Sequence, residues 1–73
     1  MSLRSLSFRE VKKKLEAAGF REVSQKGSHI KFIKATEVGT LTTIVPVHKE
    51  IAIGTLRSIL RQARISVEDF ENF

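Results

Sequence analysis

The chain of 73 residues has no cysteine, tryptophan or tyrosine, and it has only one proline and two histidines. Without cysteine, neither a disulfide nor a thiolate metal site can form, and two distant histidines among scattered carboxylates make no zinc pattern. No apolar run approaches the roughly 20 residues that span a bilayer, and residues 1–6 are too short and polar for a secretory signal. We therefore expect a cytoplasmic protein with no membrane segment, no metal ion and no small-molecule cofactor.

The length leaves room for a single domain, residues 1–73. A chain this short buries only about 60% of the surface that its unfolded form exposes, so its stability is marginal. Because disulfides and thiolate metal sites are excluded, the stability has to come from an efficient core or from a partner protein.

Positive charge is concentrated in the first half of the chain. Residues 1–34 hold nine Lys and Arg against three acids, whereas residues 35–73 hold four against five, which gives the formal net charge of +5. Such an excess suggests a polyanionic partner such as nucleic acid. The alternative is that a modest positive charge serves solubility.

A capping box opens the first predicted helix, because Ser7 and Glu10 are spaced to satisfy each other's backbone N–H groups. Gly19 suits the left-handed residue that ends a helix, so we expect a helix over residues 8–18. Its apolar positions follow helical spacing at Phe8, Val11, Leu15 and Ala18.

Arg9, Lys12 and Lys13 fall on the outer face of this helix and are candidates for contacts with RNA. The alternative is a solvated surface, on which the spacing of Lys12 and Glu16 partly neutralises the charge. The sequence leaves both interpretations open.

Three short strands follow the helix, with turns at residues 26–28 and 35–39. The strands are expected over residues 20–25, 29–34 and 40–47. Phe20 and Val23 are the apolar anchors of the first, and Pro46 indicates that the third lies at an edge or ends there. Short connections between sequential strands predict an antiparallel meander.

The second strand alternates between apolar and polar residues. Ile30 and Phe32 fall on one face, and His29, Lys31 and Ile33 fall on the other. If the apolar pair faces the core, His29 and Lys31 share the solvent face, which is not where a core histidine would lie.

A second long helix carries its apolar stripe at Ile53, Leu56, Ile59, Leu60 and Ala63. Ser66 and Asp69 then repeat the capping box and predict a short terminal helix over residues 67–72. We therefore expect an α+β fold in which two helices cover one face of the three-stranded meander and leave the other face open.

Histidine is the side chain best suited to proton transfer near neutral pH, and His29 directly follows a Gly27-Ser28 turn. RNA cleavage needs a base for the 2′-OH proton and a cation that stabilises the charge on phosphorus. Lys26 and Lys31 flank His29 as such cations, and Ser28 can donate a hydrogen bond to a phosphate. The alternative is a surface histidine beside a plain hairpin turn.

For the hypothesis that His29 cleaves RNA, the predicted mechanism is metal-independent cleavage that leaves a 2′,3′-cyclic phosphate. One histidine does not easily serve as both base and acid in a single step, so a second group is needed. His48, a lysine or water are the alternatives, and His48 as an ordinary loop histidine is a further one.

The chain resembles a known family. Residues 26–32 resemble the G-S-H-x-x-F signature of HicA-type (YcfA-like) toxins, residues 45–51 with 54–63 are similar to that family's second block, and residues 15–20 to its first. The blocks keep their order and spacing over nearly the whole chain. Arg64 departs from the pattern, because the family commonly has glycine there.

The resemblance implies an α-β-β-β-α fold like that of double-stranded-RNA-binding domains. It implies the toxin of a type II toxin–antitoxin system: an endoribonuclease (mRNA interferase) that cleaves mRNA, with His29 catalytic, Gly27 and Ser28 shaping its turn, and a HicB-type antitoxin as inhibitor. Lys26 and Lys31 are not fixed by the signature. The competing hypotheses are a non-catalytic RNA-binding module and a small interaction protein with an acidic partner.

Overall fold

The computed structural model describes residues 3–73. Met1 and Ser2, the start of the stretch judged too polar for a signal, lie outside the described residues. The elements are α1 (Phe8–Ala17), β1 (Arg21–Lys26), β2 (His29–Thr36), β3 (Gly39–Pro46), α2 (Ile53–Ala63) and α3 (Val67–Glu71). The predicted α+β order is confirmed, and the boundaries of α1, α3 and the three strands lie within two residues of their expected places.

Helix α1 has both of its predicted ends. The Ser7 hydroxyl accepts from the Glu10 backbone N–H, and the Glu10 carboxylate accepts from the Ser7 backbone N–H, which completes the capping box. At the other end Gly19 has a φ of 100°. The N–H of Phe20 then reaches the Leu15 carbonyl at 2.9 Å, which is the long hydrogen bond of a Schellman ending.

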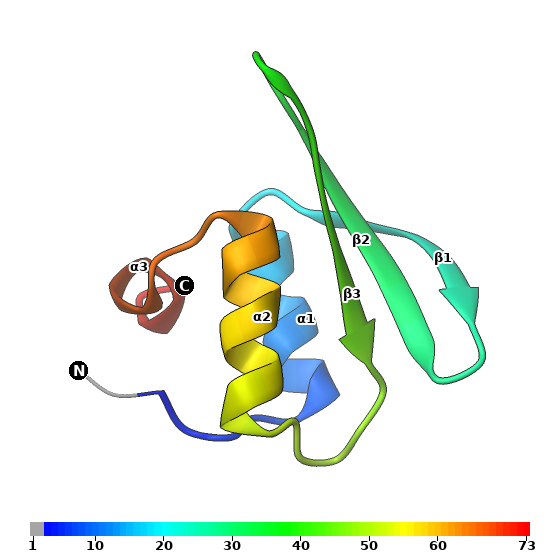
Figure 1. Cartoon of the computed structure of the whole chain (residues 1–73), viewed down its shortest axis with the longest axis vertical. Helices are drawn as coiled ribbons and strands as arrows, with labels where there is room; N and C mark the ends of the chain where they lie inside the picture. Colours follow the sequence, from blue (N-terminus) through cyan, green and yellow to red (C-terminus); the bar gives the residue numbers. More distant parts are fainter. Residues whose placement is uncertain (1–2) are drawn as a thin grey trace.

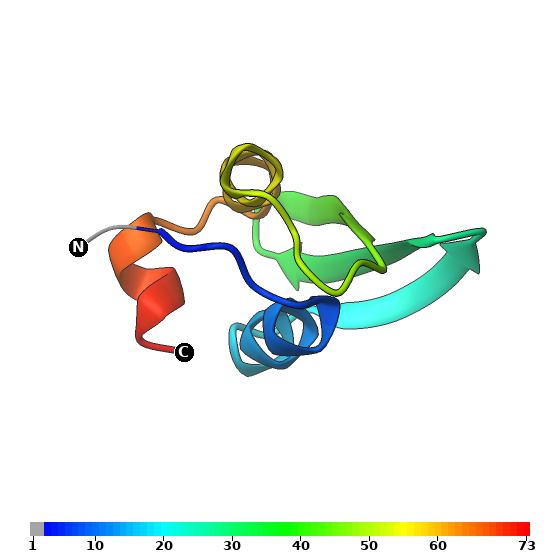
Figure 2. The ribbon, with the colours of Figure 1, turned by 90° about the horizontal axis from the view of Figure 1, so that it is seen from below.

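The three strands form an antiparallel sheet in the order β1-β2-β3, and both long helices lie on the same side of it (Figures 1 and 2). Ile30 and Phe32 of β2 point to that side and are buried, whereas His29 and Lys31 are exposed. The predicted alternation is therefore confirmed. Helix α2 packs against β3, and the two helices and the sheet enclose one hydrophobic cluster.

Two apolar anchors were predicted wrongly. Val23 is 39% exposed because the β1–β2 register shifts between Glu22 and Ser24, so Val23 is the extra residue of a β-bulge. Ile53 is also 39% exposed, while Ile51 is fully buried and forms an antiparallel bridge with Leu6. At this point of the chain the core therefore contains Ile51, from the segment before α2, in place of Ile53.

Helix α2 ends at Ala63 in a second Schellman arrangement. Arg64 takes the left-handed position with φ 56° and ψ 42°, and the Ile65 N–H reaches the Leu60 carbonyl at 3.0 Å. The helix therefore ends where glycine would normally end it, although the residue is an arginine.

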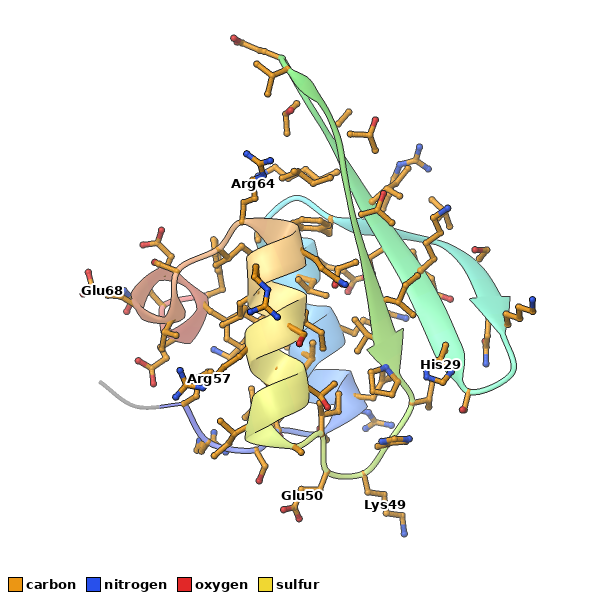
Figure 3. The ribbon with its side chains drawn as sticks, in the orientation of Figure 1. His29, Lys49, Glu50, Arg57, Arg64 and Glu68 are labelled. Atoms are coloured by element: carbon orange, nitrogen blue, oxygen red, sulfur yellow. The ribbon has the colours of Figure 1, made fainter. Side chains whose placement is uncertain are left out.

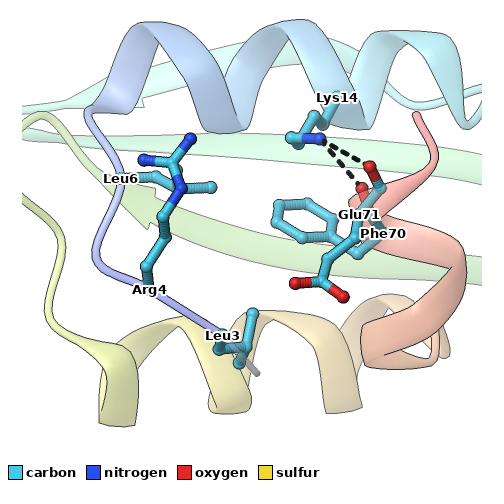
Figure 4. A pocket seen from close by; sticks show the side chains of 6 residues that line it. All are labelled: Leu3, Arg4, Leu6, Lys14, Phe70 and Glu71. Carbon is cyan, nitrogen blue, oxygen red and sulfur yellow. Dashed lines mark hydrogen bonds between the residues drawn. The ribbon is translucent and has the colours of Figure 1, made fainter. Parts of the chain in front are cut away.

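Helix α3 lies on the far side of the helices from the sheet (Figure 2). Ser66 caps it by accepting from the Asp69 N–H, which within residues 3–73 is the only half of the predicted box that forms. Lys14 of α1 holds the C-terminal end of α3 by donating to the carbonyls of Phe70 at 3.1 Å and Glu71 at 3.4 Å (Figure 4). The same ammonium also donates to the Phe73 carbonyl at 3.1 Å. Among residues 3–73, no helix is long and apolar enough to cross a membrane.

Candidate active site

The β1–β2 hairpin places Lys26 directly opposite His29. Its loop is the two-residue Gly27-Ser28 pair, and only Gly27 has a positive φ, of 60°. A positive φ at the first loop position alone is the pattern of a type II′ turn, whose twist suits a tight hairpin and whose first position favours glycine. The turn therefore sets the register that pairs the histidine with a lysine.

The open face of the sheet carries the predicted residues together. Neighbouring rows across the strands are Lys26, His29 and Pro46, then Ser24, Lys31 and Ile44. Five of these side chains line a shallow hollow of about 470 Å³: Ser24, Lys26, His29, Lys31 and Ile44. Figure 3 shows His29 at the end of the sheet where the β1–β2 hairpin turns, and its side chain is exposed to solvent.

The two lysines of the hollow carry uncompensated charge. Among residues 3–73 the ion pairs are Arg4 with Glu10 and Lys12 with Glu22, so neither Lys26 nor Lys31 is neutralised by a carboxylate. Two free ammonium groups beside an exposed imidazole attract a phosphodiester and stabilise extra negative charge on it.

The backbone around the histidine is held from two sides. The Gln25 side-chain amide donates to the Gly27 carbonyl at 3.0 Å, and the Val47 N–H donates to the Ser28 carbonyl at 2.7 Å. The turn is therefore fixed both to its own strand and to the chain that leaves β3. A fixed turn holds His29 in one place for a reaction that depends on position.

The predicted helix residues lie elsewhere. Arg9, Lys12 and Lys13 line a separate hollow on α1, together with Phe8 and Glu16. Within this set Lys12 is half-buried and pairs across to β1, with its Nζ 3.3 Å from a carboxylate oxygen of Glu22. The expected pairing of Lys12 with Glu16 was therefore wrong, and Arg9 and Lys13 are left as the exposed cations of this face.

Sequence reasoning missed Ser24, Ile44 and Arg21 as members of the open face. The position of Ser24 could have been predicted, because a two-residue loop after Lys26 places Ser24 opposite Lys31. Ile44 needed the β2–β3 register. Arg21 faces the same side as Ile33 only because of the bulge, which no signal in the sequence indicates.

Two further features of the described residues concern a shifted carboxyl pKa outside the hollow and metal binding. The pKa of Glu10 is lowered, first by the backbone hydrogen bond from Ser7, with the nearby positive charges of Arg4 and Lys14 acting in the same direction. No group of three or more His, Asp or Glu in residues 3–73 is arranged to hold a metal ion.

The geometry can be set beside known proteins. The family model described as HicA toxin of bacterial toxin-antitoxin matches residues 8–65. This chain belongs to the HicA toxin family. The match covers α1, the whole sheet and α2, so every residue of the hollow lies within the HicA region. No curated protein matches the chain significantly.

Membership makes the protein a toxin of a toxin–antitoxin system. It also supports a ribonuclease type of activity in the broad sense and implies a cognate antitoxin as partner. Helix α3 lies beyond the part that the HicA model matches.

Proposed function

We propose that this HicA toxin is an endoribonuclease that cleaves mRNA with His29 as its catalytic residue and that a HicB-type antitoxin neutralises it. The observation that carries the proposal is the hollow itself, which places an exposed histidine between two unpaired lysines on the open face of the sheet. General acid–base chemistry and charge stabilisation are the two contributions that RNA cleavage needs from a protein.

The proposed reaction is an internal transphosphorylation. Neutral His29 accepts the proton of a 2′-OH, and the 2′-oxygen forms a bond to the adjacent phosphorus. The bond from phosphorus to the 5′-oxygen breaks, and that oxygen gains a proton. Lys26 and Lys31 offset the charge on the phosphoryl oxygens, and the products are a 2′,3′-cyclic phosphate and a 5′-hydroxyl.

The cations beyond the hollow support RNA binding along two surfaces. Arg21 extends the open sheet face, and Arg9 and Lys13 are exposed on α1. The order of α1, the three strands and α2 is also the order expected for a double-stranded-RNA-binding-like fold. We expect log affinity to fall by roughly 0.7–0.9 per contacted phosphate for each log unit of salt.

The test replaces His29 by Ala and follows both cleavage and binding. We expect the rate of cleavage of labelled mRNA to fall by a factor of about 10²–10⁴ and growth arrest to disappear. RNA binding and the melting curve should stay close to those of the wild type. Glu37→Ala lies at the end of the β2–β3 hairpin that is opposite His29, and it controls for effects of substitution and purification that do not involve the hollow. Undiminished cleavage by folded His29→Ala refutes the proposal, and binding without cleavage by the wild type favours a non-catalytic RNA-binding module.

The chemistry is tested separately by the ends of the products. We expect full activity in the presence of EDTA and a 2′,3′-cyclic phosphate at each new 3′ end. A 3′-hydroxyl end, or activity that depends on an added divalent metal, contradicts the proposed reaction. The antitoxin is tested by adding the purified partner, which should abolish cleavage.

A further inference from the structure

The chain that leaves β3 brings the second histidine next to the first. Pro46, the last residue of β3, is the cross-strand partner of His29, and the Val47 N–H is bonded to the Ser28 carbonyl. Partner Cα atoms lie about 5 Å apart, and two further residues add at most about 7 Å, so the Cα atoms of His29 and His48 lie within roughly 12 Å. The fold thus gathers both histidines of the chain at one end of the sheet.

The backbone of His48 is held at both of its polar groups. Its N–H donates to the Pro46 carbonyl at 3.0 Å, and its carbonyl accepts from the Phe8 N–H, also at 3.0 Å. Phe8 is the first residue of α1, so this contact ties the β3 exit to the start of the helix. The side chain of His48 is exposed. A fixed backbone with a solvent-facing imidazole suits proton delivery to a bound substrate.

The proposed reaction needs an acid on the side of the leaving group. Attack and departure occur on opposite sides of phosphorus, so a base beside the 2′-oxygen is poorly placed to protonate the 5′-oxygen. Lys26 and Lys31 line the hollow with His29, whereas His48 is not among its lining residues and follows Pro46, the cross-strand partner of His29, by two residues. An imidazolium also gives up a proton near neutral pH far more readily than an ammonium does.

We infer that His48 is the general acid of this ribonuclease and touches the leaving 5′-oxygen, an assignment that rests on the proposed function. As the 2′-oxygen bonds to phosphorus, its proton passes to His29. As the bond from phosphorus to the 5′-oxygen breaks, protonated His48 gives its proton to that oxygen. His29 ends protonated and His48 neutral, and exchange with water restores both.

The test compares two RNAs of the same sequence around a mapped cleavage site. In one, the leaving atom is the natural 5′-oxygen, and in the other it is a bridging sulfur, which departs as a thiolate without protonation. We expect His48→Gln to lower kcat/KM on the natural RNA by about 10²–10⁴-fold and on the sulfur-bridged RNA by less than about tenfold. The alkaline fall of the pH–rate profile should disappear in the same variant. Lys49→Gln, at the exposed residue next to His48, is the matched control. Its kcat/KM relative to the wild type should be the same on both RNAs.

The outcomes separate this inference from the proposed function. If His29→Ala loses activity on both RNAs while His48→Gln cleaves the natural RNA normally, or loses activity equally on both, His48 is not the acid and the proposed function stands. If the wild type cleaves neither RNA, both proposals fail together. Melting curves of all variants exclude unfolding as the cause of a loss.

Discussion

Replacing Lys14 by Met is expected to destabilise the protein, although the sequence places Lys14 in a run of three lysines. Its ammonium donates to three carbonyls at the C-terminal end of α3 and lies 5.4 Å from the centre of the Phe70 ring. A hydrogen bond to a charged group is worth about 1.5–3 kcal/mol. Because one ammonium makes all three bonds and the last is exposed, we expect a loss of about 2 kcal/mol rather than the threefold sum.

That loss is large for this chain, because a domain of its length is stable by only about 4–11 kcal/mol. The melting temperature should fall by about 8–16 °C. Methionine preserves the length of the side chain and a sulfur contact with the Phe70 ring, so the variant isolates the lost ammonium.

The assay is thermal and urea unfolding followed by circular dichroism, with Lys13→Met as the matched control. Lys13 is exposed on the same helix, so its replacement should change the unfolding free energy by no more than about 0.5 kcal/mol. RNA binding should instead depend on Lys13 and not on Lys14. The slope of log affinity against log salt concentration should fall in magnitude by roughly 0.7 in Lys13→Met and stay unchanged in Lys14→Met. Equal stability of Lys14→Met and wild type would refute this role of Lys14.

The remaining predictions concern the helix end, the hollow and acid stability. Arg64→Gly should raise stability by up to about 1 kcal/mol, because glycine adopts the left-handed conformation without the cost that Arg64 bears; a lower melting temperature would contradict this. Lys26→Gln and Lys31→Gln should each lower kcat by about 10²-fold with little change in melting, and a change confined to KM would instead assign them to binding. Because the folded-state pKa of Glu10 is lowered from 4.5, its carboxylate contributes stability that is present above that value and lost as the pH falls through the folded pKa. Urea titrations across that range should therefore show a weaker acid dependence in Glu10→Gln than in wild type.

The parts of the fold that the sequence predicted are those decided by neighbours along the chain. The capping box at Ser7 and the Schellman ending at Gly19 each depend on residues within five positions, and both form as expected. The alternation of His29 and Ile30 needs only the period of a strand. The cluster of Lys26, His29 and Lys31 followed from these local rules.

The parts that the sequence did not predict depend on contacts across the fold. Lys14 resembles its neighbouring lysines until α3 packs beside it, and Ile51 shows its burial only once it pairs with Leu6. The partner of Lys12 proved to be Glu22, on a strand whose register is set by a bulge. Helical spacing predicts Glu16 as the partner of Lys12, because it considers only residues on the same helix. It cannot predict a partner such as Glu22 that tertiary structure brings close.

The bulge at Val23 also sorts charge between the two faces of the sheet. With the extra residue taken up there, Glu22 pairs in register with Phe32 on the helix side and meets Lys12, while Arg21 pairs with Ile33 on the open side. In a regular ladder the same two residues would exchange faces, since the side-chain period of a strand is two. A carboxylate would then share the surface offered to a phosphate. The single extra residue at Val23 therefore keeps the Glu22 carboxylate off the open face. The charge of that face depends on whether the number of residues along β1 places Arg21 or Glu22 on it.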